Sequence, residues 1–105
     1  MRKNIEIKFL TERNTILLRG ELLIENVSVA HIQLISILNS SKCNNITFCF
    51  KELKQCDIAG IQLLISMIKS LLSKNIRFNI INLNKNVTDL INLHGLGYSN
   101  IFNLE

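Results

Sequence analysis

The spacing of apolar and polar residues changes several times along the chain, and each change predicts a different structural element. Over residues 5–10, apolar residues alternate with mostly polar ones, and this period of two is typical of an edge or half-buried strand. Asn14 favours a turn, and residues 15–22 predict a second strand that ends in Gly-Glu-Leu. Residues 46–50 are almost continuously apolar, as expected for a central strand covered on both faces, and residues 76–83 predict one further strand.

Three other segments show the spacing of three and four that predicts helices. Residues 27–40 and 87–93 each carry it, and the second of these ends at His94-Gly95, where glycine suits the position after a helix. The strongest pattern begins at residue 58 and has a narrow polar stripe opposite its apolar face. Its apolar positions are Ile58, Ile61, Leu64, Ile65, Ile68, Leu71 and Leu72, and the stripe is formed by Gln62, Ser66, Lys69 and Ser73.

Asp57 stands immediately before this strongest helical pattern and is its candidate N-cap. An aspartate there can accept hydrogen bonds from the amides of Ala59 and Gly60, which stabilises the helix by roughly 1 kcal/mol. Two interpretations stay open at this point. Asp57 is simply a cap, or it is a cap whose loop also forms the centre of a surface that contacts a partner.

The order of the elements is therefore β-β-α-β-α-β-α. Strands that alternate with helices predict an α/β fold, here a central mixed sheet of four to five strands with helices packed on it. The length of 105 residues and the absence of a linker-like segment predict a single domain over residues 1–105.

Charge and composition exclude several classes of function. The net charge is +4, but the basic residues are scattered from Arg2 to Lys85 without the basic stripe expected of a nucleic-acid binder. No apolar run approaches the roughly 18 residues of a membrane span, so membrane insertion is not expected. A cytoplasmic protein fits these features.

The sequence offers little chemistry for catalysis or for a cofactor. His31 and His94 lie far apart, and no Cys, His and carboxylate residues have metal-ligand spacing. Neither a phosphate-binding loop nor a nucleophile elbow is present, so we expect no enzyme, no cofactor and no metal.

The three cysteines, Cys43, Cys49 and Cys56, are odd in number and lack C-x-x-C spacing, which favours reduced thiols. Cys49 lies within an apolar strand and is expected to be inert. Cys56 precedes a helix N-terminus, a position that can lower the pKa of a thiol and raise its reactivity. The alternative is that Cys56 is a small buried apolar residue.

Three short segments form a recognisable series that extends over nearly the whole chain. They are Gly20-Glu21-Leu22 before the first predicted helix, Cys56 to Leu64 at the start of the strongest helix, and Val87 to Ile91 with Gly95-Leu96 and Ile101-Phe102 near the end. In order and spacing they resemble the G-E-L step, the D-S-S-G-L-x-x-L signature and the closing pattern of the STAS domain family, which includes the bacterial anti-sigma factor antagonists.

In antagonists of this family, the second serine of D-S-S-G is phosphorylated by a partner kinase that is itself the anti-sigma factor. Only the unphosphorylated antagonist binds that partner. Asp57 and Gly60 match the motif, whereas Ile58 stands at the first serine and Ala59 at the phosphoacceptor. Because alanine has no hydroxyl group, the resemblance implies a protein that is not phosphorylatable at Ala59.

The resemblance implies a non-catalytic regulatory protein that binds a partner protein, in the first place an anti-sigma factor of the kinase-like ATPase type. A chemotaxis-associated signalling component is an alternative, which the run Gly60-Ile61-Gln62-Leu63-Leu64 favours. An accessory subunit of a lipid-transport ABC ATPase is another.

The expected contact surface comprises the loop before the helix at residue 58 and the first turns of that helix. Ile58 is either exposed at this loop, where it would mark an interaction site, or packed into the core. Lys54 either meets an acidic partner or is merely solvated. The candidate partner-binding residues are Glu21, Lys54, Gln55, Asp57, Ile58, Ala59 and Gln62.

Overall fold

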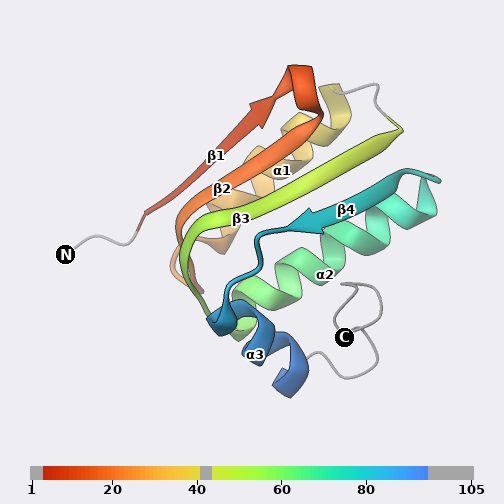
Figure 1. Cartoon of the computed structure of the whole chain (residues 1–105). Helices are drawn as coiled ribbons and strands as arrows, with labels where there is room; N and C mark the ends of the chain where they lie inside the picture. The colour runs from red at the N-terminus through yellow and green to blue at the C-terminus, as the bar shows by residue number, and fades with distance from the viewer. Residues whose placement is uncertain (1–3, 41–43, 95–105) are drawn as a thin grey trace.

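The computed structural model describes residues 4–40 and 44–94, which form an α/β fold (Figure 1). The element order β-β-α-β-α-β-α is confirmed, with a short 3₁₀ turn at Thr11–Arg13 between the first two strands. The elements are β1 (Ile5–Leu10), β2 (Thr15–Leu22), α1 (Val27–Ser40), β3 (Asn45–Cys56), α2 (Ile58–Ser73), β4 (Arg77–Ile81) and α3 (Lys85–His94).

The four strands form one mixed sheet in the order β1-β2-β3-β4. β1 and β2 are antiparallel, as their short connection requires, whereas β2, β3 and β4 are parallel. Each parallel step needs a crossover, and α1 and α2 provide the two crossovers. Right-handed crossovers in the same direction along a sheet place their helices on the same face, and α1 and α2 both lie behind the sheet in Figure 1.

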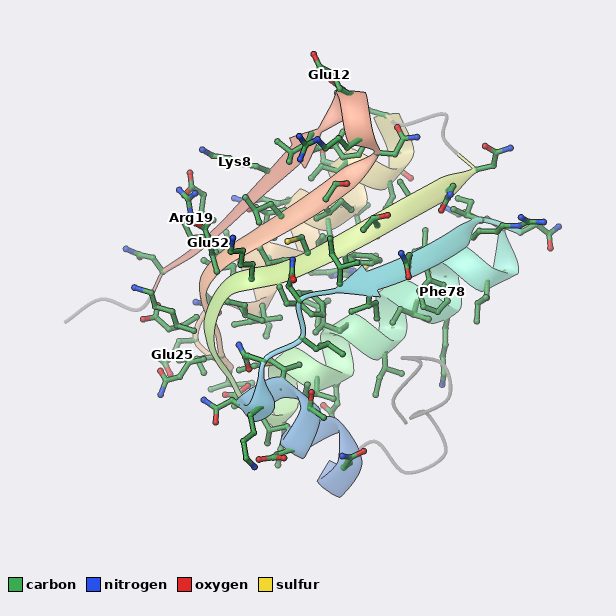
Figure 2. All side chains as sticks on the ribbon, in the orientation of Figure 1. Lys8, Glu12, Arg19, Glu25, Glu52 and Phe78 are labelled. Atoms are coloured by element: carbon green, nitrogen blue, oxygen red, sulfur yellow. The ribbon has the colours of Figure 1, made fainter. Side chains whose placement is uncertain are left out.

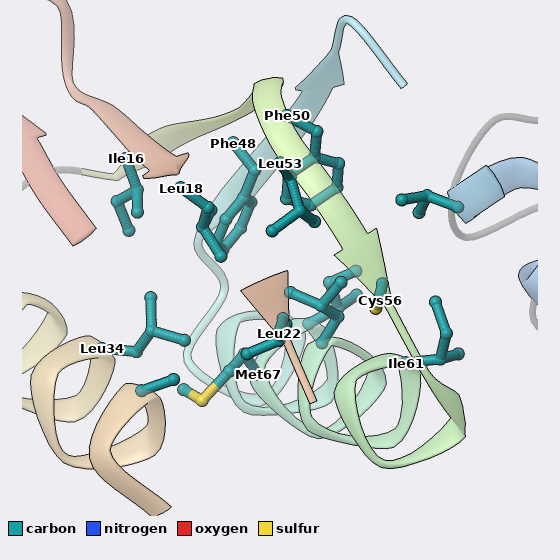
Figure 3. Packing of buried hydrophobic residues seen from close by; sticks show 14 of the residues in the cluster. Ile16, Leu18, Leu22, Leu34, Phe48, Phe50, Leu53, Cys56, Ile61 and Met67 are labelled. Atoms are coloured by element: carbon teal, nitrogen blue, oxygen red, sulfur yellow. The ribbon is translucent and has the colours of Figure 1, made fainter. Parts of the chain in front are cut away.

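Buried apolar side chains fill the space between this face and the two helices. Phe48 and Phe50 of β3 are each only 1% exposed, and the alternate residues Ile16 and Leu18 of β2 are fully buried beside them. Leu34 of α1 closes the same core from the helix side (Figure 3). This single layer of packing fixes the two helices against the sheet and hence relative to each other.

The third strand is longer than the predicted residues 46–50 and continues to Cys56. Its pairing with β2 shifts register twice, between Leu17 and Arg19 and again between Gly20 and Glu21. Such β-bulges re-aim side chains without ending a strand, which a strict period of two does not reveal. Residues 54–56, expected in a loop, therefore belong to the end of β3.

The last strand and helix also differ in extent from the prediction. β4 ends at Ile81 because Asn82 adopts a left-handed conformation with φ of 60°, which a regular strand does not accommodate. α3 begins at Lys85 because the Asn84 side chain accepts a hydrogen bond from the N–H of Val87 at 3.0 Å. The motif positions Gly95-Leu96 and Ile101-Phe102, like Cys43, lie outside the described residues.

Several charged side chains gather on the sheet face opposite the helices. Arg19 of β2 pairs with Glu52 at 2.7 Å and with Glu6 at 3.3 Å, and Lys8 lies 3.7 Å from Glu6. Figure 2 shows Lys8, Arg19 and Glu52 on this open face, and about half of each side chain is exposed. Exposed pairs of this kind contribute little to stability because solvent screens them, so their main effect is to make this face polar.

Candidate functional site

The candidate site lies at the edge of the sheet where the parallel strands β2 and β3 both end. Glu21 is paired with Gln55 and Leu22 with Cys56, so the two strand ends are side by side. The connection from β2 to α1 and the start of α2 therefore leave the sheet at the same place. The carboxyl ends of parallel strands are where open α/β sheets commonly bind their ligands.

Asp57 connects these two segments through both oxygens of its carboxylate. One oxygen accepts a hydrogen bond from the N–H of Gly60 at 3.0 Å, which is the expected N-cap of α2. The other accepts from the N–H of Ile24 at 2.9 Å, in the loop between β2 and α1. The predicted second bond, to Ala59, is replaced by this contact with a different segment. Asp57 is thus a cap and a cross-link.

Asn26 holds the same loop from within. Its side-chain oxygen accepts from the N–H of Leu23 at 2.8 Å, and its side-chain amide donates to the carbonyl of Glu21 at 2.7 Å. Asn26 is only 7% exposed, so these bonds satisfy a buried amide. The loop between β2 and α1 is consequently held by hydrogen bonds with the Asn26 side chain as well as with Asp57.

Gly60 allows α2 to begin close to the end of β2. A Cβ atom at this position would lie 2.4 Å from the carbonyl oxygen of Leu22 and 2.7 Å from the sulfur of Cys56. Both distances are shorter than any real contact. The N–H of Asp57 also donates to the Leu22 carbonyl at 3.2 Å. Glycine is therefore required here for close approach of backbone to backbone.

Two isoleucines are exposed around this fixed junction. Ile24 in the loop is 65% exposed, and Ile58 in the first turn of α2 is 44% exposed. Ala59 lies next to Ile58 and lines a shallow groove between α1 and α2 with a volume of about 260 Å³. Its other lining residues are Ile24, Val27, Ser28, His31, Gln62 and Leu63.

The structure brings most of the sequence-predicted site residues to this end of the sheet. Asp57, Ala59 and Gln62 lie at the junction or in the groove, and Ile58 is exposed beside it but does not line the groove. The Glu21 carboxylate accepts a hydrogen bond from the N–H of Asn4 at 3.2 Å. Lys54 and Gln55 are exposed on the last residues of β3, as part of a strand and not of a loop.

The loop at residues 23–26 was absent from the sequence-predicted site, and so was the contribution of α1. Ile24, Ser28 and His31 line the groove from that side. One local signal was available, since Asn26 directly precedes the helical pattern at Val27, and asparagine is a common helix-start residue. The contact of Ile24 with Asp57 had no such signal.

The interpretation of Cys56 as a thiol activated by the helix N-terminus is wrong. The pKa of the Cys56 thiol is raised to about 12 from an ordinary 9.0. Burial is the main cause of this rise, and the negative charge of neighbouring Asp57 adds to it. The side chain is 8% exposed and contributes to the core beside Leu22 and Ile61 (Figure 3). Cys56 therefore stays a protonated, buried thiol at neutral pH.

Within residues 4–40 and 44–94, no three His, Cys, Asp or Glu side chains are grouped so as to hold a metal ion. In the same residues, none of the helices has both the length and the apolar character needed to cross a membrane.

Solved structures with the same fold include two of the anti-sigma factor antagonist SpoIIAA. The unphosphorylated form has a TM-score of 0.69 at 21% identity, covering 90% of this chain and 83% of that one. The phosphorylated form from Bacillus has a TM-score of 0.65 at 20% identity, covering 90% and 86%. A candidate anti-sigma factor antagonist from Thermotoga maritima has a TM-score of 0.69 at 21% identity, covering 88% and 79%.

At these identities the structural likeness establishes the fold. Among curated proteins, no significant match to the sequence is found. The family assignment comes from the sequence profile of the STAS domain, which matches residues 4–104 and thus nearly the whole length. The chain belongs to the STAS domain family.

Proposed function

We propose that this chain is a non-catalytic regulatory protein that binds a partner protein at the junction of β2, β3 and α2. One observation carries the proposal: the Asp57 carboxylate holds the loop at Ile24 against the start of α2. Exposed Ile24 and Ile58 are thereby kept in place near Ala59. Apolar groups exposed on a fixed backbone favour binding, because little conformational entropy remains to be lost.

The partner we propose is an anti-sigma factor of the kinase-like ATPase type, met in the cytoplasm. Family membership supports this choice, together with the fold shared with anti-sigma factor antagonists. The partner would contact exposed or half-buried side chains at the strand ends, in the loop before α1 and in the first turns of α2. These residues are Glu21, Ile24, Lys54, Gln55, Ile58, Ala59 and Gln62.

The partner would remain bound without the phosphate switch of the related antagonists. SpoIIAA has been solved in an unphosphorylated and a phosphorylated form. In this chain Ala59, at the position that resembles the phosphoacceptor, offers only a methyl group to the groove. A phosphate there would add a charge of about −1.5 to −2 next to the apolar side chain of Ile24, and burying this charge against a partner would weaken binding. Ala59 has no hydroxyl group to carry such a phosphate.

An affinity capture tests the proposal. The full chain is immobilised, exposed to a lysate of the organism that encodes it, and the retained proteins are identified by mass spectrometry. Native protein is compared with Ile24→Lys, which places a charge in the proposed surface. Leu72→Lys is the matched control, because Leu72 is 48% exposed near the other end of α2.

Retention of a kinase-type anti-sigma factor by the native chain and by Leu72→Lys, but not by Ile24→Lys, supports the proposal. Retention of chemotaxis or ABC-transport proteins instead would replace the proposed partner by one of the alternatives. Equal retention by all three forms would place the binding surface elsewhere on the molecule.

A further inference from the structure

The groove beside Ala59 is lined by residues of α1, of α2 and of the loop before α1. Figure 1 shows α1 and α2 on the same side of the sheet, where they follow the parallel strands β2 and β3. The lining residues are spaced by three and four: Ile24, Val27, Ser28 and His31 on the α1 side, and Ala59, Gln62 and Leu63 on the α2 side. On α2 the lining runs from Ala59 to Leu63, about one turn, and on the other side it runs from the loop at Ile24 to His31 in α1.

The walls of the groove carry no fixed charge. None of the seven lining residues is Asp, Glu, Lys or Arg, and α1 as a whole contains none of these four residue types. Beyond the groove, Val29 and Ile32 of α1 are 52% and 69% exposed. An exposed helix without charged residues is unusual on a protein surface, where such a face is normally solvated by Lys and Glu. Four of the seven lining residues are apolar, and Ser28, His31 and Gln62 are polar, so this surface suits an occupant whose facing side is mainly apolar.

A negative charge without an ion pair among the described residues stands next to Ile24, one of the groove residues. Glu25 is the exposed neighbour of Ile24, and it forms no ion pair within residues 4–40 and 44–94. Of the other acidic groups at this end of the sheet, Asp57 accepts two backbone hydrogen bonds and Glu21 accepts one from the N–H of Asn4. In Figure 2, Glu25 extends into solvent apart from the charged cluster at Arg19 and Glu52. A Lys or Arg of an occupant could therefore form an ion pair with Glu25, which is not already paired with the Arg19 cluster.

We propose that the groove binds an amphipathic helix of the partner protein, with its apolar face against α1 and α2 and a Lys or Arg beside Glu25. This proposal rests on the proposed function, because it names the kind of segment that the same surface accepts. A helix fits better than an extended strand, because the groove is formed by side chains of two helices and offers no sheet edge for pairing.

Nuclear magnetic resonance with model peptides tests this chemistry without a known partner. The full isotope-labelled chain is titrated with a Leu/Lys peptide of about 14 residues, four helical turns with one apolar face. Two further peptides serve as comparisons: the same composition scrambled so that no apolar face forms, and a Leu/Glu peptide with the same apolar face. The protein has a net charge of +4, which repels the Leu/Lys peptide and attracts the Leu/Glu peptide. Stronger binding of the Leu/Lys peptide would therefore not be explained by net charge.

Shifts at the groove residues are expected with the Leu/Lys peptide, with affinity about tenfold above that of either comparison peptide. Ala59→Arg fills the groove and should remove these shifts. Ser73→Arg adds the same charge near the end of α2 and should leave them unchanged. Glu25→Lys should reverse the preference toward the Leu/Glu peptide.

Three outcomes overturn the inference: no shifts in the groove, equal affinity for all peptides, or binding that Ala59→Arg does not change. Groove shifts that depend on protein concentration without peptide would show that a second copy occupies the site, which also overturns it. The affinity capture tests the proposed function independently of these peptides. Peptide binding in the groove without capture of a partner would sink the proposed function while leaving the helix-binding chemistry intact.

Discussion

The carboxylate of Asp57 accepts a hydrogen bond from the backbone N–H of Ile24 at 2.9 Å, across a sequence separation of 33 residues. This bond joins the loop after β2 to the start of α2. It explains why a residue that caps a helix also shapes a surface on another segment. The Asp57 carboxylate thus positions the exposed Ile24 side chain indirectly, by holding the backbone N–H of the same residue.

Asp57→Ala should destabilise the fold by about 1–2 kcal/mol, because it removes an N-cap and leaves the amide of Ile24 without its partner. Urea unfolding of the variant and the native protein measures this difference. Asp57→Asn keeps one oxygen acceptor and should lose less. Equal stability of the alanine variant and the native protein would show that the cross-link has no energetic role.

Gly60→Ala should be destabilising by roughly 1–3 kcal/mol, although alanine is normally the better helix former. The added methyl group would lie 2.4 Å from the Leu22 carbonyl oxygen and force the start of α2 away from β2. Thermal unfolding compares it with Gln62→Ala, an exposed substitution on the same helix that should have little effect. A stabilised Gly60→Ala would contradict the close approach.

Cys56 should be almost unreactive in the folded protein. With a pKa raised to about 12 by burial, the thiolate fraction at neutral pH falls about a thousandfold below that of an ordinary thiol. Alkylation by iodoacetamide is followed in a variant that retains only Cys56, Cys43→Ser/Cys49→Ser. The unfolded variant in urea is the control. Fast modification under native conditions would be inconsistent with the buried thiol.

The same pKa predicts a dependence of stability on alkaline pH. The unfolded thiol loses its proton near its ordinary pKa of 9.0, whereas the folded thiol keeps it to about 12. The unfolded state thus binds fewer protons between these values, and the contribution of Cys56 to stability, complete below pH 9, is lost as pH rises toward 12. The difference between native and Cys56→Ala unfolding free energies, measured across this range, should shrink accordingly.

Ala59→Ser restores a hydroxyl group at the position that resembles the family phosphoacceptor. If the captured partner is a kinase, it should transfer phosphate from ATP to Ser at position 59 of the variant but not to native protein, as mass spectrometry would detect. Phosphorylation should then weaken binding, because the added charge lies in an uncharged groove. Phosphate on Ser66 or another hydroxyl of the native chain would contradict binding without a phosphate switch.

The sequence by itself determined the elements whose signals are local. Helical spacing after Asp57 located α2 to within a residue, and the alternation in residues 5–10 located β1. The motif with Ala59 in place of serine pointed to the family. These signals depend on residues within a few positions of each other, which interact in the same way in any fold that contains the element.

Only the tertiary structure decided how the site is assembled. The contact of Asp57 with Ile24, the bulges that carry β3 to Cys56, and the groove at Ala59 all depend on pairing of β2 with β3. The raised pKa of Cys56 likewise follows from packing against distant residues. Hydrogen bonds across 33 residues and the burial of a thiol are set by the register of a parallel sheet, which local periodicity does not encode.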